Sequence, residues 1–337
     1  MACSAGGEID AHTWHVELVA PRLAGAMPQY QSLTIRQVGH LAGNLWEQLE
    51  LPWFARGRLL FDPSNTGPVL KGFQAVNLHD ASVFAVPGSY SFAFRMKYRL
   101  ILSVLSRSAM PILTDSEFSR GELVKYCRAN RDRIQVVPLA GDHLLNTPTD
   151  DTVFAEQGIG LAPYFLAVGS NAPHKNLVIL AQAMSMLPDP GFEMVVAGGD
   201  YHKIFRASGL DSQESIKRLG YVSEGELKAL YQRATALVFP SLYEGFGLPP
   251  LEAMACGCPV ICARAASLPE VCGDAALYFD PRNPRDLADK IHAFIQDPGL
   301  AAGLRERGFR QAKRFSWLET GRQTWAALTS RLAQPLP

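Results

Sequence analysis

Two glutamates, Glu244 and Glu252, flank a glycine-containing loop in the second half of the chain, within the segment SLYEGFGLPPLEAM. The loop follows an apolar, strand-like run, and a helix is predicted to begin near Pro249, because proline is well tolerated in the first turn of a helix. Gly245 and Gly247 allow the backbone to turn tightly and to come close to a ligand. The pattern therefore predicts a ligand site where a strand gives way to a helix.

The chemistry of this segment favours a phosphate with a sugar on each side. Main-chain N–H groups between Gly247 and Leu251 are predicted to point at an anion, helped by the positive end of the helix dipole. A carboxylate can accept paired hydrogen bonds from a vicinal diol. Glutamates on both sides of an anion site therefore predict a ribose beside one carboxylate and a hexose beside the other, which together describe a sugar nucleotide.

Short apolar runs alternate with helical stretches along the whole chain, a pattern typical of parallel sheets with crossover helices. In the first half, strands are predicted at 15–20, 58–62, 73–79, 111–114 and 134–138, with helices at 37–49 and 92–108. In the second half, strands are predicted at 164–168, 192–197, 216–221, 236–239, 259–263 and 277–279. Helices are predicted there at 176–186, 223–233, 249–254 and 284–296. Ser223 followed by Glu226 predicts a capping box, and the tail at 299–332 is predicted to be helical with breaks at Gly303 and Gly308.

The polar, turn-rich stretch after Pro138 predicts a boundary between two domains. We expect one Rossmann-like domain at 1–150, a second at 151–315, and a helix at 316–337 that packs back on the first domain. The predicted fold class is α/β, with two doubly wound domains facing one another. Such sheets bind ligands beyond the carboxyl ends of their strands.

Length and composition fit this architecture and exclude other classes. The 337 residues suffice for two domains of roughly 150 residues each. Hydrophobic residues make up 47% and charged residues 19%, as in ordinary globular proteins. Lys and Arg number 32 and Asp and Glu also number 32, and this balance disfavours a protein that coats nucleic acid. No apolar run is long enough to span a membrane and the first residues lack a signal-peptide core, which predicts a cytoplasmic protein.

No metal site is predicted. The chain contains no Asp-x-Asp tripeptide, a pair of carboxylates that could hold a divalent cation on a diphosphate. Cys256, Cys258, Cys262 and Cys272 are clustered but lack the Cys-x-x-Cys spacing of zinc knuckles. These cysteines are expected to be small buried side chains in a reducing compartment.

The glutamate segment, extended as SLYEGFGLPPLEAMACGCPVI with seven residues between the glutamates, resembles the signature of glycosyltransferase family 4, whose members have the GT-B fold. YFLAVGSNAPHKNL resembles the family's donor-phosphate loop, and LGYVSEGELKALYQRA resembles the stretch that lines the base. NLHDASVFAVPGS, LTDSEFSRGEL and the tripeptide Phe315-Ser316-Trp317 resemble the bacterial mannosyltransferase-like branch. The resemblance covers the chain from Phe73 to the C-terminus.

The resemblance implies roles for individual residues. Lys175 is implied to pair with the donor diphosphate as a point charge, Glu252 to hold the ribose, and Glu244 to lie beside the transferred sugar. His79 is implied to lie across the cleft near the anomeric centre, so that Lys175, Glu244 and His79 form the implied catalytic set. The implied donor-binding set is Gly169, Ser170, Lys175, Gly198, Tyr221, Val222, Glu244, Gly245, Phe246, Gly247, Leu248 and Glu252.

The resemblance also implies a reaction. It is the retaining, metal-independent transfer of a hexose from a nucleotide sugar to a polysaccharide or lipid-linked acceptor, which the first domain would bind. GDP-mannose is the first expectation for the donor; no cofactor is implied, since the nucleotide sugar is a substrate, and no nucleic-acid partner is expected. Charge that grows on the diphosphate would be stabilised by Lys175 and the helix N-terminus. Two alternatives stay open: a non-catalytic nucleotide-sugar-binding partner of an active transferase, and another GT-B enzyme such as a nucleotide-sugar epimerase.

Two features depart from the family pattern. Many relatives carry an arginine five positions before the lysine, where this chain has Ser170, so one phosphate cation is missing unless another residue supplies it. The segment WHVELVAP resembles the family's second strand although it begins at Trp14. This predicts a shortened first domain, either because the chain is truncated or because the domain has lost an element. Gly6 and Gly7 would then be a remnant of a glycine-rich loop.

Some of these residues also fit simpler structural roles. His79, followed by Asp80 at a strand end, fits a hydrogen-bonded structural histidine. Asp115 and Ser116 are expected to cap the helix that follows them.

The predicted helix at 92–108 carries Arg95 and Arg99 on one face and apolar residues on another. We expect a core-packed helix with a solvated basic face. The alternative is a peripheral contact with anionic lipid at the inner face of the plasma membrane, which would suit a lipid-linked acceptor.

Overall fold

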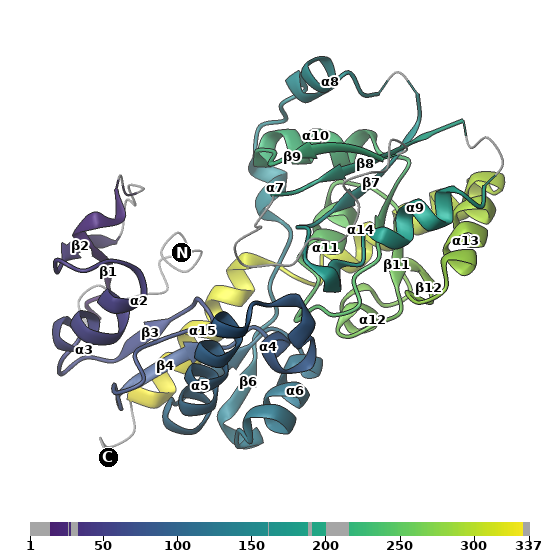
Figure 1. Ribbon diagram of the computed structural model, residues 1–337. Helices are drawn as coiled ribbons and strands as arrows, with labels where there is room; N and C mark the ends of the chain where they lie inside the picture. The colour runs from purple at the N-terminus through teal and green to yellow at the C-terminus, as the bar shows by residue number, and fades with distance from the viewer. Residues whose placement is uncertain are drawn as a thin grey trace.

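The computed structural model describes residues 14–25, 27, 33–160, 162–187, 191–199 and 216–332, which form two α/β lobes (Figure 1). Gly6 and Gly7 lie outside the described residues. Every strand pairing among the described residues is parallel. This agrees with the near-continuous apolar runs of the sequence, because strands of parallel sheets are covered on both faces.

The first lobe contains a four-stranded sheet and a separate pair of strands. The sheet has the order β3–β4–β5–β6, with β3 at Leu60–Asp62, β4 at Gln74–Asn77, β5 at Ile112–Thr114 and β6 at Ile134–Val136. The separate pair is β1 (Glu17–Pro21) with β2 (Thr34–Val38). Helix α2 (Gly43–Leu45) continues through a π-helical turn (Trp46–Glu50) into α3 (Leu51–Phe54), and α4 (Ser82–Ala85), α5 (Phe92–Ser108) and α6 (Glu117–Cys127) follow. Because β4 and β5 are parallel neighbours, the residues that follow them, among them His79 and Asp115, meet at one edge of the sheet.

The second lobe contains one six-stranded sheet with the order β12–β11–β10–β7–β8–β9. Its strands are β7 (Tyr164–Val168), β8 (Glu193–Ala197), β9 (Ile216–Gly220), β10 (Ala236–Phe239), β11 (Val260–Ala263) and β12 (Ala276–Phe279). Its helices are α9 (Val178–Met184), α10 (Glu224–Arg233), α11 (Leu248–Ala255), α12 (Leu268–Cys272), α13 (Pro284–Gln296) and α14 (Pro298–Ala312). Strands β8 and β9 extend the sheet on one side of β7, and β10, β11 and β12 then extend it on the other side. The strand order therefore reverses at β7, and doubly wound sheets bind ligands at such a switch point.

The chain crosses between the lobes twice. The first crossing carries the short helices α7 (His143–Asn146) and α8 (Thr152–Gln157). The second leads into α15 (Trp317–Leu332), the yellow helix that returns to the first lobe in Figure 1, where Ala327 is buried with Leu113 and Val137. The crossings are bonded to each other: the Trp317 N–H donates to the Asp142 carboxylate (3.1 Å), and the Thr320 hydroxyl donates to the Pro138 carbonyl (2.6 Å).

Most of the predicted elements are confirmed. The structure gives the same bounds as the sequence for 92–108, 164–168, 236–239 and 284–296. The capping box at the start of α10 is also confirmed: the Ser223 hydroxyl accepts from the Glu226 N–H (3.3 Å), and the Glu226 carboxylate accepts from the Ser223 N–H (2.6 Å).

Two predictions about helices are wrong. Residues 37–49 do not form one helix, because Thr34–Val38 is the partly exposed strand β2 and helical structure begins only at Gly43. The breaks at Gly303 and Gly308 do not occur, since α14 runs through both glycines. Gly308 instead permits close packing on α11: a Cβ at this position would lie 3.3 Å from Cγ of Met254.

Helix α5 does not have the predicted solvated basic face. Phe92, Met96 and Leu100, which follow one another at a spacing of four residues, are 69%, 50% and 66% exposed and form one stripe. The guanidinium of Arg95 lies 5.5 Å from the centre of one aromatic ring, and that of Arg99 lies 5.1 Å from another. The expected core packing is confirmed, since Ile101, Leu102 and Leu105 are buried. The expected basic face is wrong because the long cationic side chains pack on rings, while the apolar stripe faces outward.

Candidate active site

The predicted donor-binding residues gather at the carboxyl ends of four adjacent strands of the second lobe. Strand β7 is followed by Gly169 and Ser170, β8 by Gly198, β9 by Tyr221 and Val222, and β10 by the glutamate loop at 244–248. The backbones beyond β7 and β8 approach each other closely, because a Cβ on Gly198 would lie 2.1 Å from the Gly169 carbonyl oxygen. Only glycine permits this approach, which brings the ends of β7 and β8 together at the switch point.

Lys175 and Glu244 form the centre of the site. Nζ of Lys175 lies 2.8 Å from Oε1 of Glu244, and the two side chains are 22% and 12% exposed. Lys175 lies in a 3₁₀ turn (Pro173–Lys175), and the next residue, Asn176, adopts a left-handed conformation. The Asn176 side-chain amide donates to the main-chain carbonyls of Pro240 (3.2 Å) and Pro281 (2.8 Å). The turn that carries the lysine is thus held against the loops that follow β10 and β12.

Serine hydroxyls hold successive carbonyl groups of the glutamate loop. The Ser267 hydroxyl is 2.9 Å from the Glu244 carbonyl oxygen and 2.8 Å from that of Phe246. Ser116 and Ser119, both from the first lobe, donate to the Gly245 carbonyl. Because serine hydroxyls bind these three carbonyl groups, the backbone of the loop has a defined orientation.

The N–H groups of this loop can bind an anion. Within the described chain, no acceptor is bonded to the N–H groups of Phe246, Gly247 and Leu248, which lead into α11. The donor set predicted between residues 247 and 251 needs correction, since Pro249 and Pro250 have no N–H. Gly247 is required at its position, because its φ is +100° and a Cβ would lie 2.6 Å from the Leu268 side chain. The loop and the first turn of α11 therefore offer main-chain donors beside the Lys175 ammonium group.

Glu252 projects from α11 and is 7% exposed. Its Oε2 accepts a hydrogen bond from the Tyr231 hydroxyl (3.1 Å), and its Oε1 lies 3.4 Å from Nε2 of His143. Trp317 donates from its indole N–H to Nδ1 of His143 (3.2 Å), so Nε2 carries the proton that faces the carboxylate. Burial raises the pKa of Glu252, while His143 and Tyr231 oppose that shift. The predicted role of Glu252 in holding ribose stays a prediction, and a diol would share the carboxylate with these two partners.

His79 uses both ring nitrogens inside the first lobe. Nδ1 is 2.7 Å from Oδ2 of Asp115, and Nε2 is 2.9 Å from the Pro63 carbonyl oxygen. Burial alone would lower the pKa of His79, but the hydrogen bond to Asp115 and the charge of Asp115 outweigh it, so the pKa is raised. Asp115 therefore binds His79 as well as preceding the helix cap. The catalytic role of His79 stays a prediction, and its ring is a hydrogen-bonded histidine in this structure.

The two lobes touch at the glutamate loop. A Cβ on Gly245 would lie 2.5 Å from the His79 carbonyl oxygen and 2.9 Å from Cβ of Asp80. The backbone of His79 is therefore directly across from the loop, as the resemblance implies for the residue. Asp80 is half-buried beside this contact, where loss of solvent raises the pKa of its carboxyl and the Ser82 N–H donates to its carboxylate (2.7 Å).

The sequence reasoning missed His174 as a member of the site. His174 is buried between the lobes, and its ring lies 6.0 Å from the ring of Tyr90 in a stacked arrangement. Burial, and then the charge of Lys175, lower the pKa of His174 to about 4, so the ring is neutral near pH 7. Its carbonyl accepts from the Leu242 N–H (2.8 Å), which adds a further tie between the lysine turn and the glutamate loop. The histidine directly before Lys175 in the donor-loop segment was a signal that could have identified it.

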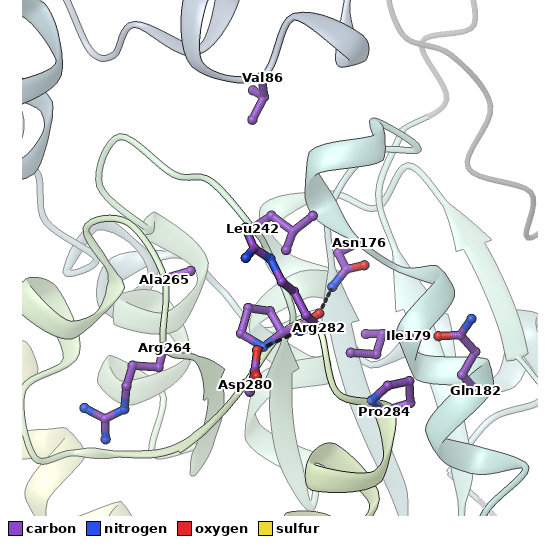
Figure 2. Close-up of a pocket in the computed structure, with 11 residues that line it drawn as sticks. Val86, Asn176, Ile179, Gln182, Leu242, Arg264, Ala265, Asp280, Arg282 and Pro284 are labelled. Carbon is purple, nitrogen blue, oxygen red and sulfur yellow. Dashed lines mark hydrogen bonds between the residues drawn. The ribbon is translucent and has the colours of Figure 1, made fainter. Parts of the chain in front are cut away.

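A cavity of about 610 Å³ lies beside the site, at the carboxyl ends of β10, β11 and β12 (Figure 2). Arg282 extends over Leu242, Arg264 points away from the group, and Val86 of the first lobe lies on the opposite side, apart from the others (Figure 2). None of the predicted donor-binding residues lines this cavity. It is therefore separate from the Lys175–Glu244 centre, although Asn176 borders both.

In the part of the chain that the structure covers, no group of three or more His, Cys, Asp or Glu side chains is arranged to hold a metal ion. Among the helices of the described ranges, none combines the length and apolarity that crossing a membrane demands.

The arrangement of the lobes matches that of known glycosyltransferases. Sucrose-phosphate synthase from Thermosynechococcus elongatus superimposes with a TM-score of 0.74 at 19% identity, over 98% of this chain and 91% of that chain. WaaG, a glycosyltransferase involved in lipopolysaccharide biosynthesis, gives a TM-score of 0.70 at 16% identity, over 97% of this chain and 94% of that chain. At these identities the likeness shows the fold alone, and it confirms the predicted GT-B class of two facing doubly wound domains.

Sequence comparison then gives the family. Residues 150–311 match the model of the glycosyl transferases group 1. O-antigen chain mannosyltransferase B of Escherichia coli is 36% identical over 257 residues, which cover 73% of this chain and 67% of that protein. O-antigen chain mannosyltransferase RfbU of Salmonella typhimurium is 29% identical over 248 residues, with the same shares covered. The chain belongs to the glycosyl transferases group 1 family, in its mannosyltransferase-like branch, and it matches about two thirds of the length of these relatives.

Proposed function

We propose that the protein is a retaining, metal-independent hexosyltransferase that moves mannose from GDP-mannose to a glycan or lipid-linked acceptor during assembly of a surface polysaccharide. The observation that carries the proposal is the Lys175–Glu244 pair beside the N–H groups of Phe246, Gly247 and Leu248, at the switch point of the sheet. The names of the two mannosyltransferase relatives support mannose as the sugar and a surface polysaccharide as the product.

These residues can stabilise the charge of a departing diphosphate. As the bond between the anomeric carbon and the phosphate oxygen breaks, negative charge grows on the diphosphate, and donors already oriented toward it lower the barrier. Lys175 supplies the positive charge and the loop amides supply hydrogen bonds. For retention, the acceptor oxygen attacks from the face that the phosphate leaves, and the acceptor proton passes to the departing phosphate oxygen. Glu244, 2.8 Å from Lys175, is proposed to contact the transferred sugar.

We also propose that Arg218 supplies the second phosphate cation. Many relatives have an arginine for this role at the position where this chain has Ser170. A terminal nitrogen of its guanidinium lies 2.8 Å from Oδ1 of Asn171, the residue that follows Ser170. Arg218 projects from β9, two strands away from β7 in the sheet. A guanidinium is always charged and can bind phosphate oxygens in pairs, so we assign Arg218 the role of the second phosphate cation.

A donor panel tests the proposal. The protein is incubated with GDP-mannose, GDP-fucose, UDP-glucose and dTDP-sugars, with and without a chelator, and release of nucleoside diphosphate is measured. We expect slow hydrolysis of GDP-mannose that the chelator leaves unchanged, with the α configuration retained in the product. Loss of turnover on chelation would contradict metal independence, and binding without turnover even with acceptor glycans would favour a non-catalytic nucleotide-sugar-binding partner.

The proposal includes a peripheral contact between α5 and an anionic membrane, which would bring a lipid-linked acceptor to the first lobe. The exposed stripe of Phe92, Met96 and Leu100 lies on a helix that carries four cations and no acidic residue. An apolar stripe among cationic side chains is complementary to the surface of an anionic bilayer. The stripe would enter the acyl boundary, and the cationic side chains, which pack on rings but stay partly exposed, would meet the headgroups.

Substitution of the stripe is expected to weaken vesicle binding. Met96→Glu with Leu100→Glu should lower sedimentation with phosphatidylglycerol vesicles by about tenfold or more, since two apolar contacts are lost and two like charges are added. Met186→Glu with Ile295→Glu is the matched control, because these side chains are 38% and 41% exposed on the second lobe. Equal binding by both double variants, or equal binding of the unaltered protein to neutral phosphatidylcholine vesicles, would contradict the membrane contact.

A further inference from the structure

The N-terminus of helix α6, in the first lobe, is bonded to the second lobe. The carboxylate of Glu270, on α12, accepts hydrogen bonds from the main-chain N–H groups of Glu117 (2.8 Å) and Phe118 (3.1 Å). A carboxylate at this position satisfies N–H groups that have no partner inside the helix, and it interacts favourably with the helix dipole. The second lobe thus supplies part of the cap of a helix that belongs to the first.

The same helix end reaches the glutamate loop. The hydroxyls of Ser116 (2.5 Å) and Ser119 (2.9 Å) both donate to the carbonyl oxygen of Gly245. Ser116 also caps α6 as predicted, because its hydroxyl accepts from the Ser119 N–H (3.0 Å). Both serines are at most 1% exposed, so water does not compete for these bonds. Ser116 therefore does more than cap a helix, while Asp115, which was also expected to cap it, binds His79 instead.

The Gly245 carbonyl belongs to a peptide group that also carries a donor of the candidate phosphate site. A peptide bond is planar and trans, so its carbonyl and its N–H point in opposite directions. The carbonyl oxygen of Gly245 and the N–H of Phe246 share one such plane. Serines that fix the carbonyl toward the first lobe therefore fix the direction of the Phe246 N–H, which has no acceptor within the described residues.

We propose that Ser116, Ser119 and Glu270 form an interdomain latch, in which the two serines are positioning residues for the donor-phosphate loop. When the lobes are together, the latch holds the peptide between Gly245 and Phe246 in the orientation that presents its N–H to the donor. When the lobes separate, the carbonyl loses both hydroxyls and this peptide can turn. The latch rests on the proposed function, since it acts on the site that binds the nucleotide sugar.

The latch couples closure of the lobes to donor binding, so that each favours the other. If closure improves the binding of the diphosphate by fixing an N–H group, then the diphosphate must favour closure by the same factor. Ser267, which holds the neighbouring carbonyls of Glu244 and Phe246, belongs to the second lobe and is the same in both states. Among the three carbonyl groups bound by serines, that of Gly245 is the one bonded to the first lobe, so we expect its peptide to sense closure.

Three variants test the latch: the double substitution Ser116→Ala with Ser119→Ala, the single substitution Glu270→Ala, and Ser108→Ala as the control. Ser108 is an exposed serine whose hydroxyl bonds only to its own helix. Each protein is measured for affinity toward GDP by calorimetry, for radius of gyration by X-ray scattering without nucleotide, and for thermal unfolding. We expect the serine double variant to bind GDP about tenfold more weakly, since two hydrogen bonds to one carbonyl are lost, and to have a larger radius of gyration.

Glu270→Ala is expected to give the same two changes with a smaller loss of affinity, and because Glu270 is exposed it provides a readout even if the buried serine variant does not fold. Ser108→Ala should match the unaltered protein. If either GDP affinity or radius of gyration is unchanged in the folded latch variants, the latch is overturned. Failure of the unaltered protein to bind any nucleoside diphosphate would instead overturn the proposed function, while the radius of gyration would still test the latch.

Discussion

Replacement of Lys175 by methionine is expected to lower kcat/KM for sugar transfer by about 100-fold or more, because removal of one preorganised donor to a developing charge costs a factor of this order. Methionine keeps most of the length and apolar contact of the side chain but removes the charge. The substitution also leaves Glu244, 12% exposed, without the ammonium group that now lies 2.8 Å away. The measurement is the initial rate of mannose transfer or donor hydrolysis, with the affinity for GDP taken in parallel.

Lys290→Met is the matched control for this substitution. Lys290 is a half-exposed lysine on α13 whose nearest carboxylate, that of Asp286, is 4.0 Å away. Surface ion pairs of this kind contribute little to stability, so this variant should keep full activity. A second variant, Glu244→Gln, separates the roles of Lys175 and Glu244. If Lys175 acts mainly on the donor, Lys175→Met should lower kcat/KM in the Glu244→Gln protein as well. Activity of Lys175→Met within threefold of the unaltered protein would contradict the assignment of the phosphate cation.

Gly245→Ala is expected to lower kcat/KM by about 10- to 100-fold, because displacement of catalytic groups by about 1 Å can cost two orders of magnitude. The added Cβ would lie 2.5 Å from the His79 carbonyl oxygen, which is a main-chain atom and cannot move aside as a flexible side chain can. Either the loop or the whole first lobe must shift. Steady-state kinetics and X-ray scattering measure the two consequences.

Gly121→Ala is the control for the glycine substitution. Gly121 lies within α6, and a Cβ at this position would meet nothing within 4 Å. Alanine there should keep full activity and raise the stability slightly, by roughly the 0.5–1 kcal/mol that separates glycine from alanine in a helix interior. A Gly245→Ala protein with unaltered kinetics would show that the contact between the loop and His79 does not matter for turnover.

The fold was predictable where burial made the sequence pattern strong. Strands β7 and β10 lie in the centre of a parallel sheet, and their continuous apolar runs matched their observed bounds. Strand β2 lies at an edge and reads TIRQV, with only its last residue buried, so it has no such run and was missed. Gly308 was interpreted as a helix break because its packing against Met254, more than fifty positions earlier in the chain, leaves no local signal.

The site was predictable where one segment carried its own chemistry. The glutamate loop and the lysine turn were each identified from the sequence, and the structure brings Lys175 and Glu244 into contact. Ser116 was expected only as a helix cap, because its bond to Gly245 joins residues 129 positions apart. The two partners of Glu252, His143 and Tyr231, also come from distant segments. Contacts between elements depend on how the lobes pack, which local residue patterns do not report.

The paired crossings between the lobes restrict how the protein can move. Trp317 is hydrogen-bonded to Asp142, so the two segments that connect the lobes are joined to each other. We expect them to act as one pivot and not as two independent connections. Rotation about a single pivot changes the gap at the far side without stretching either connection. His143 is part of this pivot and lies 3.4 Å from the carboxylate of Glu252, so we expect a rotation of the lobes to reach that carboxylate through one imidazole ring.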